Sequence, residues 1–216
     1  MPSGRRRGER GGSNLRRTVG IRLPKKRVVV VCEGSKTEPA YLRLVNAKAQ
    51  NGLIQMEVVD KTGTAPKTLV ELASSLMKDA RKVARRTRDP NAQIEETWCV
   101  FDVDEHPLIK EACQQARDND VQLAISNPSV ELWFLLHFVS QTAYIGRQEA
   151  ERKLKSYITD YNKNLPILRP LEGRYQEAKL RAQNLALKHE GDGTYFPENN
   201  PSSDLWKLVE SLNASY

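Results

Sequence analysis

Residues 27–32 read RVVVVC, an apolar run in which four consecutive valines show no alternation with polar residues. A strand that is covered on both faces, as in a parallel α/β sheet, has this pattern. A Glu-Gly-Ser turn follows, and Thr37 to Ala49 then places apolar residues at helical spacing. This stretch therefore predicts a buried strand that leads into a helix.

The same alternation of strand and helix continues to residue 125. Strand patterns occupy 53–59, 96–102 and 121–125, and helical patterns occupy 66–86 and the stretch through Ile109, Ala112 and Ala116. The order βαβαβαβ predicts an α/β fold with one mostly parallel sheet of about four strands flanked by helices. On the long helix, the side chains expected to face inward are Leu69, Leu72, Leu76 and Val83.

After Ser129 the pattern is helical only, at 130–139, 146–157, 171–189 and 202–212. We therefore expect three parts: a disordered basic arm (1–24), an α/β domain (25–140) and an all-helical extension (141–216) packed on it. No apolar run approaches the ~20 residues needed to span a bilayer, so no membrane segment is expected. The odd, widely spaced Cys32, Cys99 and Cys113 favour buried thiols and a reducing cytoplasm.

The net charge of +7 is unevenly distributed along the chain. Residues 1–27 hold ten basic residues and one acidic residue, a charge of +9, which leaves about −2 for residues 28–216. Basic segments can bind nucleic-acid phosphates by releasing counterions, although a solubilising tail and a solvated helix face have the same composition. The candidate nucleic-acid contacts are Arg5, Arg6, Arg7, Arg16, Arg17, Lys25, Lys26, Arg81, Lys82, Arg85 and Arg86.

Acidic residues follow two of the predicted strands. Glu33 comes directly after the first strand and is followed by Gly34, where backbone can approach a ligand closely, so it is a candidate metal or acid–base residue. Glu38 either supports that site or favours the dipole of the next helix, for which Ser35 or Thr37 is a candidate N-cap.

Asp102 and Asp104 follow the third strand, and two aspartates one residue apart in extended chain project to the same side. Such a pair can hold Mg²⁺, which prefers carboxylate, water and phosphate oxygens. His106 is a candidate ligand or proton donor, or only a residue of the following helix. Sites of parallel sheets lie beyond the carboxyl ends of the strands, so these residues are expected at one sheet edge.

A third group follows the fourth strand. Asn127 and Glu131 fall at the same predicted edge, and His137 lies further along the helix, where it serves either the site or the core. Ser129 is placed to cap this helix, whose apolar residues pack inward. Asn127, Glu131 and His137 are therefore candidates for residues that support the site.

The segments VVCEGSKTEPAYL (30–42), FDVDEH (101–106) and NPSVELWFLLHF (127–138) together resemble the RloB-like family, and NPSSDLWKLVE (200–210) is similar to a C-terminal helix of that family. The fold of the family looks like a variant of the Toprim domain of topoisomerases, primases and OLD-family nucleases. The resemblance implies an acid–base or metal-associated role for Glu33 and a metal-holding role for Asp102 and Asp104. It also implies Mg²⁺- or Mn²⁺-dependent cleavage of DNA or RNA in bacterial anti-phage defence, beside an ABC or AAA ATPase partner.

No tyrosine or serine is marked as a covalent nucleophile, so we expect hydrolysis by water rather than strand passage. One alternative is a non-catalytic or regulatory subunit that binds nucleic acid or a nucleotide and works with a partner ATPase. The other is a nucleic-acid-binding protein whose activity lies in the arm alone. The sequence does not define an oligomeric state.

Overall fold

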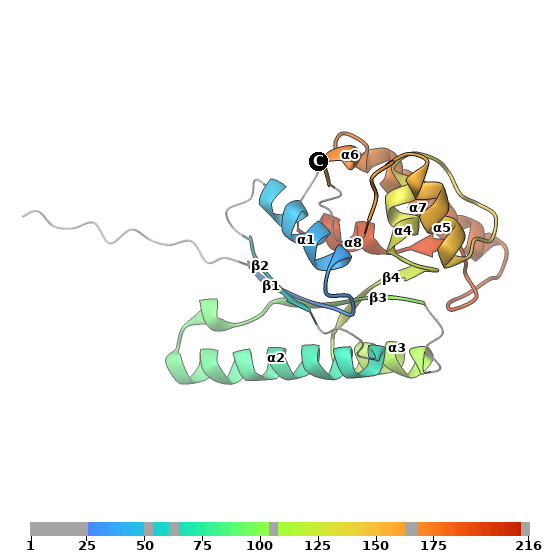
Figure 1. Ribbon diagram of the computed structural model, residues 1–216. Helices are drawn as coiled ribbons and strands as arrows, with labels where there is room; N and C mark the ends of the chain where they lie inside the picture. Colours follow the sequence, from blue (N-terminus) through green and yellow to red (C-terminus); the bar gives the residue numbers. More distant parts are fainter. Residues whose placement is uncertain (1–25, 50–53, 61–64, 104–107, 163–167, 213–216) are drawn as a thin grey trace, which may run out of the picture.

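The computed structural model describes residues 26–49, 54–60, 65–103, 108–162 and 168–212. Its centre is a five-stranded sheet in the order β2-β1-β3-β4-β5 (Figure 1). Strands β1 to β4 pair in parallel, and β5 runs antiparallel to β4. The bounds are Lys26–Cys32 for β1, Ile54–Asp60 for β2, Glu96–Asp102 for β3, Gln122–Asn127 for β4 and Ser202–Ser203 for β5.

The two most apolar strands lie inside the sheet. All residues from Val28 to Cys32 in β1 are buried, as are all residues from Thr97 to Asp102 in β3. The edge strand β2 has no fully buried residue. The buried strand predicted from residues 27–32 is therefore confirmed, because a strand with neighbours on both sides and helices on both faces has no polar face.

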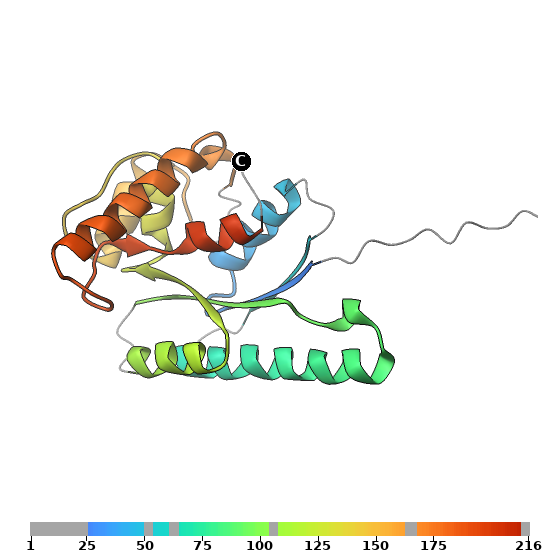
Figure 2. The same cartoon turned by 180° about the vertical axis from the view of Figure 1, so that it is seen from behind.

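Helices lie on both sides of the sheet and give the fold three layers (Figures 1 and 2). On one side, α2 (Pro66–Thr87) and α3 (Ile109–Asp118) pack together, and a short 3₁₀ turn, η1 (Pro90–Ala92), precedes β3. The other side holds α1 (Thr37–Lys48), α4 (Val130–Leu136), α5 (Arg147–Lys155), α6 (Leu168–Leu171), α7 (Tyr175–Gly191) and α8 (Leu205–Ser211).

Each side of the sheet has its own apolar core. Val28 and Val30 pack with α1, α4 and the C-terminal helices, whereas Val29 and Val31 pack with α2 and α3. This division follows from the two-residue period of a strand. Burial of one such aliphatic side chain contributes about 1.5–3 kcal/mol to stability.

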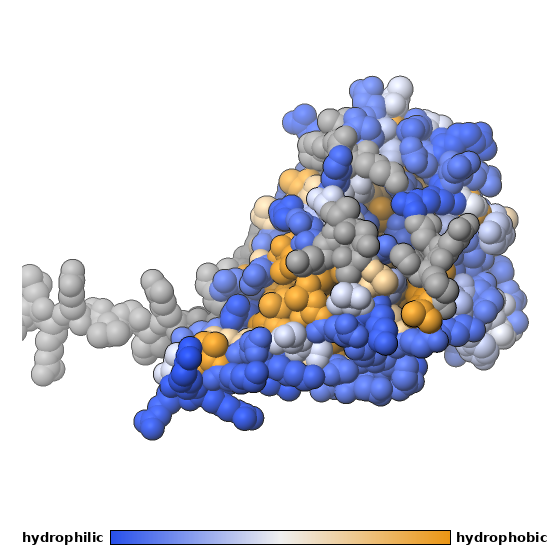
Figure 3. Space-filling view, turned by 60° about the horizontal axis from the view of Figure 1, so that its bottom comes forward, coloured by the Kyte–Doolittle hydropathy of each residue, from blue (hydrophilic) through white to orange (hydrophobic). Residues whose placement is uncertain are grey.

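The far half of α2 differs from the prediction. Leu69 is buried and Leu72 and Leu76 are partly buried, but Val83 is 39% exposed. The last turns of α2 extend past the sheet (Figures 1 and 2), and within the described part of the chain Val83 does not belong to the apolar core on this side. Viewed toward α2, the surface shows hydrophilic residues along the length of this helix and an apolar area beside it (Figure 3).

The predicted α/β fold with a mostly parallel sheet is confirmed, with five strands rather than about four, but the C-terminal part is not all-helical as predicted. Ser202 and Ser203 form the fifth strand, opposite Asn127 and Ser126 of β4, and α8 begins only at Leu205. Two hydrogen bonds hold this segment on the sheet: the Oγ atoms of Ser203 and Ser126 are 3.0 Å apart, and the backbone N–H of Asp204 donates to the carbonyl of Ile125 at 2.8 Å.

The helix predicted over 171–189 is interrupted. Gly173 has a φ of +75°, a left-handed conformation that glycine adopts without steric cost, and it separates α6 from α7. The three cysteines are buried free thiols, as expected. Among the described helices, none combines the length and the apolar character that a membrane span requires. The predicted basic arm lies outside the described residues.

Candidate functional site

Glu33 and Asp102 leave neighbouring parallel strands at the same edge of the sheet. Asp102 is the last residue of β3, and its backbone pairs with Ser126 of β4. The pairing continues past each strand, because the N–H of Glu33 donates to the carbonyl of Val100 at 3.0 Å and that of Val103 to the carbonyl of Ser126 at 2.9 Å. Asp104 and His106 lie outside the described residues.

Glu38 brings a second carboxylate to this edge from the first turn of α1. It is buried, and its carboxylate lies against Gly34 so closely that a Cβ there would be 2.7 Å from Oε1 and 2.8 Å from Cδ. Gly34 is therefore the residue that leaves room for Glu38. The sequence suggested Ser35 or Thr37 as the N-cap of α1. The N-cap residue is instead Lys36, whose side chain makes no capping bond.

Glu131 brings a third carboxylate from the first turn of α4 and is 1% exposed. Ser129 occupies the N-cap position of this helix, as predicted, but its side chain makes no capping bond. Its Oγ donates instead to Oε2 of Glu131 at 2.6 Å. The hydroxyl of Tyr161 donates to Oε1 at 3.0 Å, and burial together with the Glu131 charge raises the pKa of Tyr161. Tyr161 thus stays a proton donor, and both oxygens of Glu131 are held in place.

A cavity of about 180 Å³ opens where these elements meet. The β1–α1 turn, the end of β3 and the first residues of α1, α4 and α5 all contribute to it. The residues that line it are Gly34, Ser35, Lys36, Thr37, Glu38, Asp102, Val130, Glu131 and Arg147.

The carboxyl group of Asp102 has a strongly raised pKa. Burial is the main reason why its pKa lies well above the ordinary value, and the negative charges of Glu38 and Glu131, then Glu33, raise it further. The guanidinium of Arg147, 4.0 Å from Oδ2, lowers it in part. Burial and nearby like charges both disfavour the ionised form of Asp102. The excess of acidic groups at this edge of the sheet therefore favours binding of a cation.

Gly34→Ala should displace the Glu38 carboxylate without unfolding the protein. The added methyl group meets the end of a side chain rather than backbone, so we expect the free energy of unfolding to change by less than about 1 kcal/mol. The pKa of Asp102 should fall, because the Glu38 charge moves away from it. Carbon-13 NMR titration of the carboxyl groups and urea unfolding measure the two effects. Gly191→Ala is the control, since a methyl there meets no atom within 4 Å; an unchanged pKa of Asp102 would contradict the expectation.

The carboxylates fit Mg²⁺ in kind, because they are hard oxygen donors. In spatial grouping the described part of the chain falls short, since no three of its Asp, Glu, His or Cys residues are arranged to hold a metal ion. Asp104, the second aspartate of the predicted pair, is outside that part. The predicted metal site of Glu33, Asp102 and Asp104 therefore stays a prediction.

The model of one protein family, described as RloB-like protein, matches residues 28–212. The chain belongs to the RloB-like family. The match continues through α8 and so includes α4 and α5, whose first residues line part of the cavity. No curated protein and no solved structure gave a significant match.

Asn127 of this RloB-like protein binds a loop rather than the cavity. Its Nδ2 donates to the carbonyl of Pro197 at 2.8 Å and lies 3.3 Å from Oδ1 of Asn199. Its Oδ1 accepts from Nδ2 of Asn200 at 3.1 Å. The residue thus connects the carboxyl end of β4 with the segment that precedes β5.

His137 lies in the core between α4 and α7. Its Nδ1 is 2.9 Å from the carbonyl of Trp133, its ring packs edge-on against that indole, and burial lowers its pKa to about 4. The imidazole is therefore neutral at physiological pH and donates through Nδ1. Arg174 and Arg181 are the charges that act on it, and neither lines the cavity.

The described basic candidates lie away from the cavity. Lys26 begins β1 at the opposite edge of the sheet, where it forms an ion pair with Glu96 and donates to the carbonyl of Ser211 at 3.1 Å. Arg81, Lys82, Arg85 and Arg86 are exposed on the second half of α2. The other candidates, from Arg5 to Lys25, lie outside the described residues.

Two residues of the cavity region escaped the sequence-based prediction. Arg147 and Tyr161 both follow residue 141, in a part of the RloB-like chain that the helical pattern marked as an extension. Neither has a spacing to Glu33 or Asp102 that would have pointed to it, because the fold brings them together across large separations in sequence.

Proposed function

We propose that this RloB-like chain is a metal-dependent nuclease that hydrolyses phosphodiester bonds of DNA or RNA. The observation that carries the proposal is the cavity at the carboxyl ends of the strands, which Glu38, Asp102 and Glu131 line. Burial and the neighbouring negative charges also raise the pKa of Asp102. Strongly perturbed acids in a cavity are characteristic of functional sites. The resemblance of the Glu33 and Asp102/Asp104 segments to a Toprim site supports the same assignment.

In this proposal Asp102 and Asp104 would hold the ion, and Glu33 would accept the proton of the attacking water and pass it to the leaving oxygen. Mg²⁺ or Mn²⁺ supplies a positive charge beside the scissile phosphate when it is bound. Glu38 and Glu131 maintain the negative potential that attracts the cation. We assign the attack to water, which needs no covalent intermediate on the protein.

The resemblance also supports a place in bacterial anti-phage defence in the cytoplasm, beside an ABC or AAA ATPase partner. The exposed arginines and lysine of α2 are suited to contact nucleic-acid phosphates from outside the cavity. Residues Arg5 to Lys25 would add to that affinity.

Cleavage assays test the proposal directly. The full chain is incubated with single- and double-stranded DNA and with RNA, in Mg²⁺, in Mn²⁺ and in EDTA. We expect cleavage only with metal, and a loss of at least about a hundredfold in Glu33→Gln, the order found when one electrostatic group of a catalytic site is removed. Glu71→Gln, an exposed position on α2, should retain activity. Equal cleavage by wild type and Glu33→Gln would sink the assignment.

The second candidate is a regulatory subunit that binds nucleic acid or a nucleotide and works with an ATPase. One observation favours it: the described residues do not by themselves group three metal ligands. Absence of cleavage under every metal and substrate condition, together with partner binding that survives loss of Glu33, Asp102 and Asp104, would put it in place of the nuclease.

A further inference from the structure

Arg147 is the first residue of α5 and reaches the cavity from the C-terminal part of the chain. It lies on the same face of α5 as Ala150 and Leu154, three and seven residues later, and both of those are buried. The inward face of the helix thus ends in a guanidinium beside Asp102. The side chain is 41% exposed, so it is accessible from solvent as well as from the cavity.

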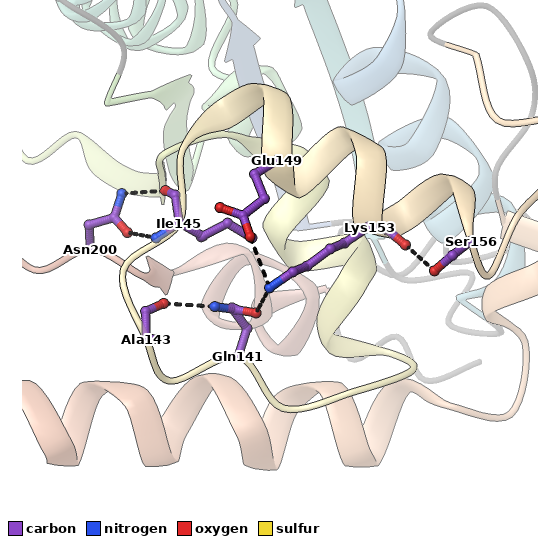
Figure 4. A network of polar contacts seen from close by, with 7 residues as sticks. All are labelled: Gln141, Ala143, Ile145, Glu149, Lys153, Ser156 and Asn200. Atoms are coloured by element: carbon purple, nitrogen blue, oxygen red, sulfur yellow. Dashed lines mark hydrogen bonds and ion pairs between the residues drawn. The ribbon is translucent and has the colours of Figure 1, made fainter.

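The backbone just before Arg147 is fixed by a single asparagine. The N–H of Ile145 donates to Oδ1 of Asn200, and Nδ2 of Asn200 donates to the carbonyl of Ile145, both at 3.0 Å (Figure 4). Ile145 is fully buried, and Asn200 also donates to Asn127 at the end of β4. We call these contacts of Asn127, Asn200 and Ile145 the asparagine bracket.

A second set of contacts holds the body of α5 against the preceding loop. Lys153 donates to Oε1 of Gln141 at 3.0 Å and forms an ion pair with Glu149 at 3.2 Å (Figure 4). Gln141 is buried, and its Nε2 donates to the carbonyl of Ala143 at 2.7 Å. The start of α5 is therefore fixed from both sides, and its position is coupled to β4 through the bracket.

We propose that Arg147 binds a phosphate oxygen of the substrate and that Asn200 is its positioning residue, an inference that rests on the nuclease function proposed above. A phosphodiester approaching a cluster of carboxylates is repelled, and a fixed guanidinium at the cavity offsets that repulsion. Its planar fork of donors matches phosphate geometry. The guanidinium lies 4.0 Å from Oδ2 of Asp102, beyond the distance of a direct hydrogen bond.

The inference also gives Asn127 a role. It does not reach the cavity, but through Asn200 it sets where the inward face of α5 begins. A fault in the bracket should therefore weaken phosphate binding without changing the carboxylates themselves.

The test compares full-length wild type with Arg147→Ala, Arg147→Lys, Asn200→Ala and Arg152→Ala. Arg152 is the matched control because it is an exposed arginine of the same helix that does not line this cavity; it shares only a separate, open surface hollow with Arg147. Two measurements are made on each: binding of inorganic phosphate, followed by phosphorus-31 line broadening with Mg²⁺ present, and kcat and KM for oligonucleotide cleavage.

We expect Arg147→Ala to weaken phosphate binding and to raise KM by roughly tenfold to a hundredfold, the loss of one charge-assisted hydrogen bond. Arg147→Lys should recover part of the binding, Asn200→Ala should be intermediate, and Arg152→Ala should match wild type. Wild-type phosphate binding and KM in Arg147→Ala, or absence of phosphate binding by wild type, would overturn the inference. Phosphate binding that depends on Arg147 in a protein that cleaves nothing would uphold the anion site and reject the nuclease.

Discussion

Replacing Asp102 by asparagine should raise the free energy of unfolding at pH 8 by about 1–2 kcal/mol, as other stabilising substitutions do. The wild-type carboxyl is buried beside Glu38 and Glu131, and its folded-state pKa is well above the ordinary value. The folded state is therefore less stable at pH 8 than at low pH, because the unfolded chain ionises this carboxyl group more readily than the folded chain does. Asparagine keeps the shape of the side chain and removes the charge.

The effect should depend on pH with a definite sign. Because the folded-state pKa is raised, the protonated group contributes stability that is full below the unfolded-state pKa of about 3.9 and is lost as the pH rises through the raised value. Wild type and Asp102→Asn should therefore have similar stability near pH 4 and diverge as the pH increases.

Urea unfolding at pH 4 and pH 8 measures this difference, and Asp160→Asn, at an exposed position, is the control. The same variant should lose phosphodiester cleavage by at least about a hundredfold. A variant that is less stable than wild type at pH 8 would show that the carboxyl is held by favourable contacts, contrary to the repulsion inferred here.

Trp133→Ala should lower the free energy of unfolding by about 3–5 kcal/mol, the range for removal of a buried aromatic residue. Trp133 is fully buried, and its ring packs edge-on against His137 and Tyr175. Its indole N–H donates to the hydroxyl of Tyr41 at 2.8 Å. Because Tyr41 is on α1 and Trp133 on α4, this contact joins the two helices that carry Glu38 and Glu131.

Tyr41→Phe separates the hydrogen bond from the packing. It leaves the buried indole N–H without its acceptor, which costs about 1–3 kcal/mol. Trp206→Ala, at a partly exposed tryptophan of α8, is the control for the size of the residue and should cost less than Trp133→Ala. Urea unfolding compares all three, and a smaller loss for Trp133→Ala than for Trp206→Ala would contradict this account of the core.

The sequence was sufficient for the parts of the fold that carry a periodic apolar pattern. Residues 28–32 and 98–101 are continuous apolar runs, and they lie in β1 and β3, two of the three inner strands. Ser202 and Ser203 have no such pattern, since a two-residue strand of serines is defined only by its partners on β4. The pattern was misleading for Val83. Its spacing in α2 fits an inward face, but its side chain is exposed because the last turns of α2 extend past the sheet.

The site residues at the ends of predicted strands could be predicted from the sequence. Those that reach the site from segments far away in sequence could not. Glu33 follows β1 and Asp102 is the last residue of β3. Because these strands are parallel, the order of strands alone placed both residues at the same edge of the sheet. Arg147, Tyr161 and Asn200 act through contacts with partners far away in sequence. Ser129 occupies the predicted N-cap position, but its hydroxyl donates a hydrogen bond to the buried carboxylate of Glu131 and makes no capping bond to the helix backbone.

The asparagine bracket has a consequence for how the protein is made. Asn127 and Asn200 are 73 residues apart, and Ser126 and Ser203 are 77 apart. During synthesis β1, β3 and their carboxylates leave the ribosome well before the segment that fixes α5. A nascent chain, or one cut before residue 200, thus holds the acidic edge without a placed Arg147, so the site is completed only late in translation.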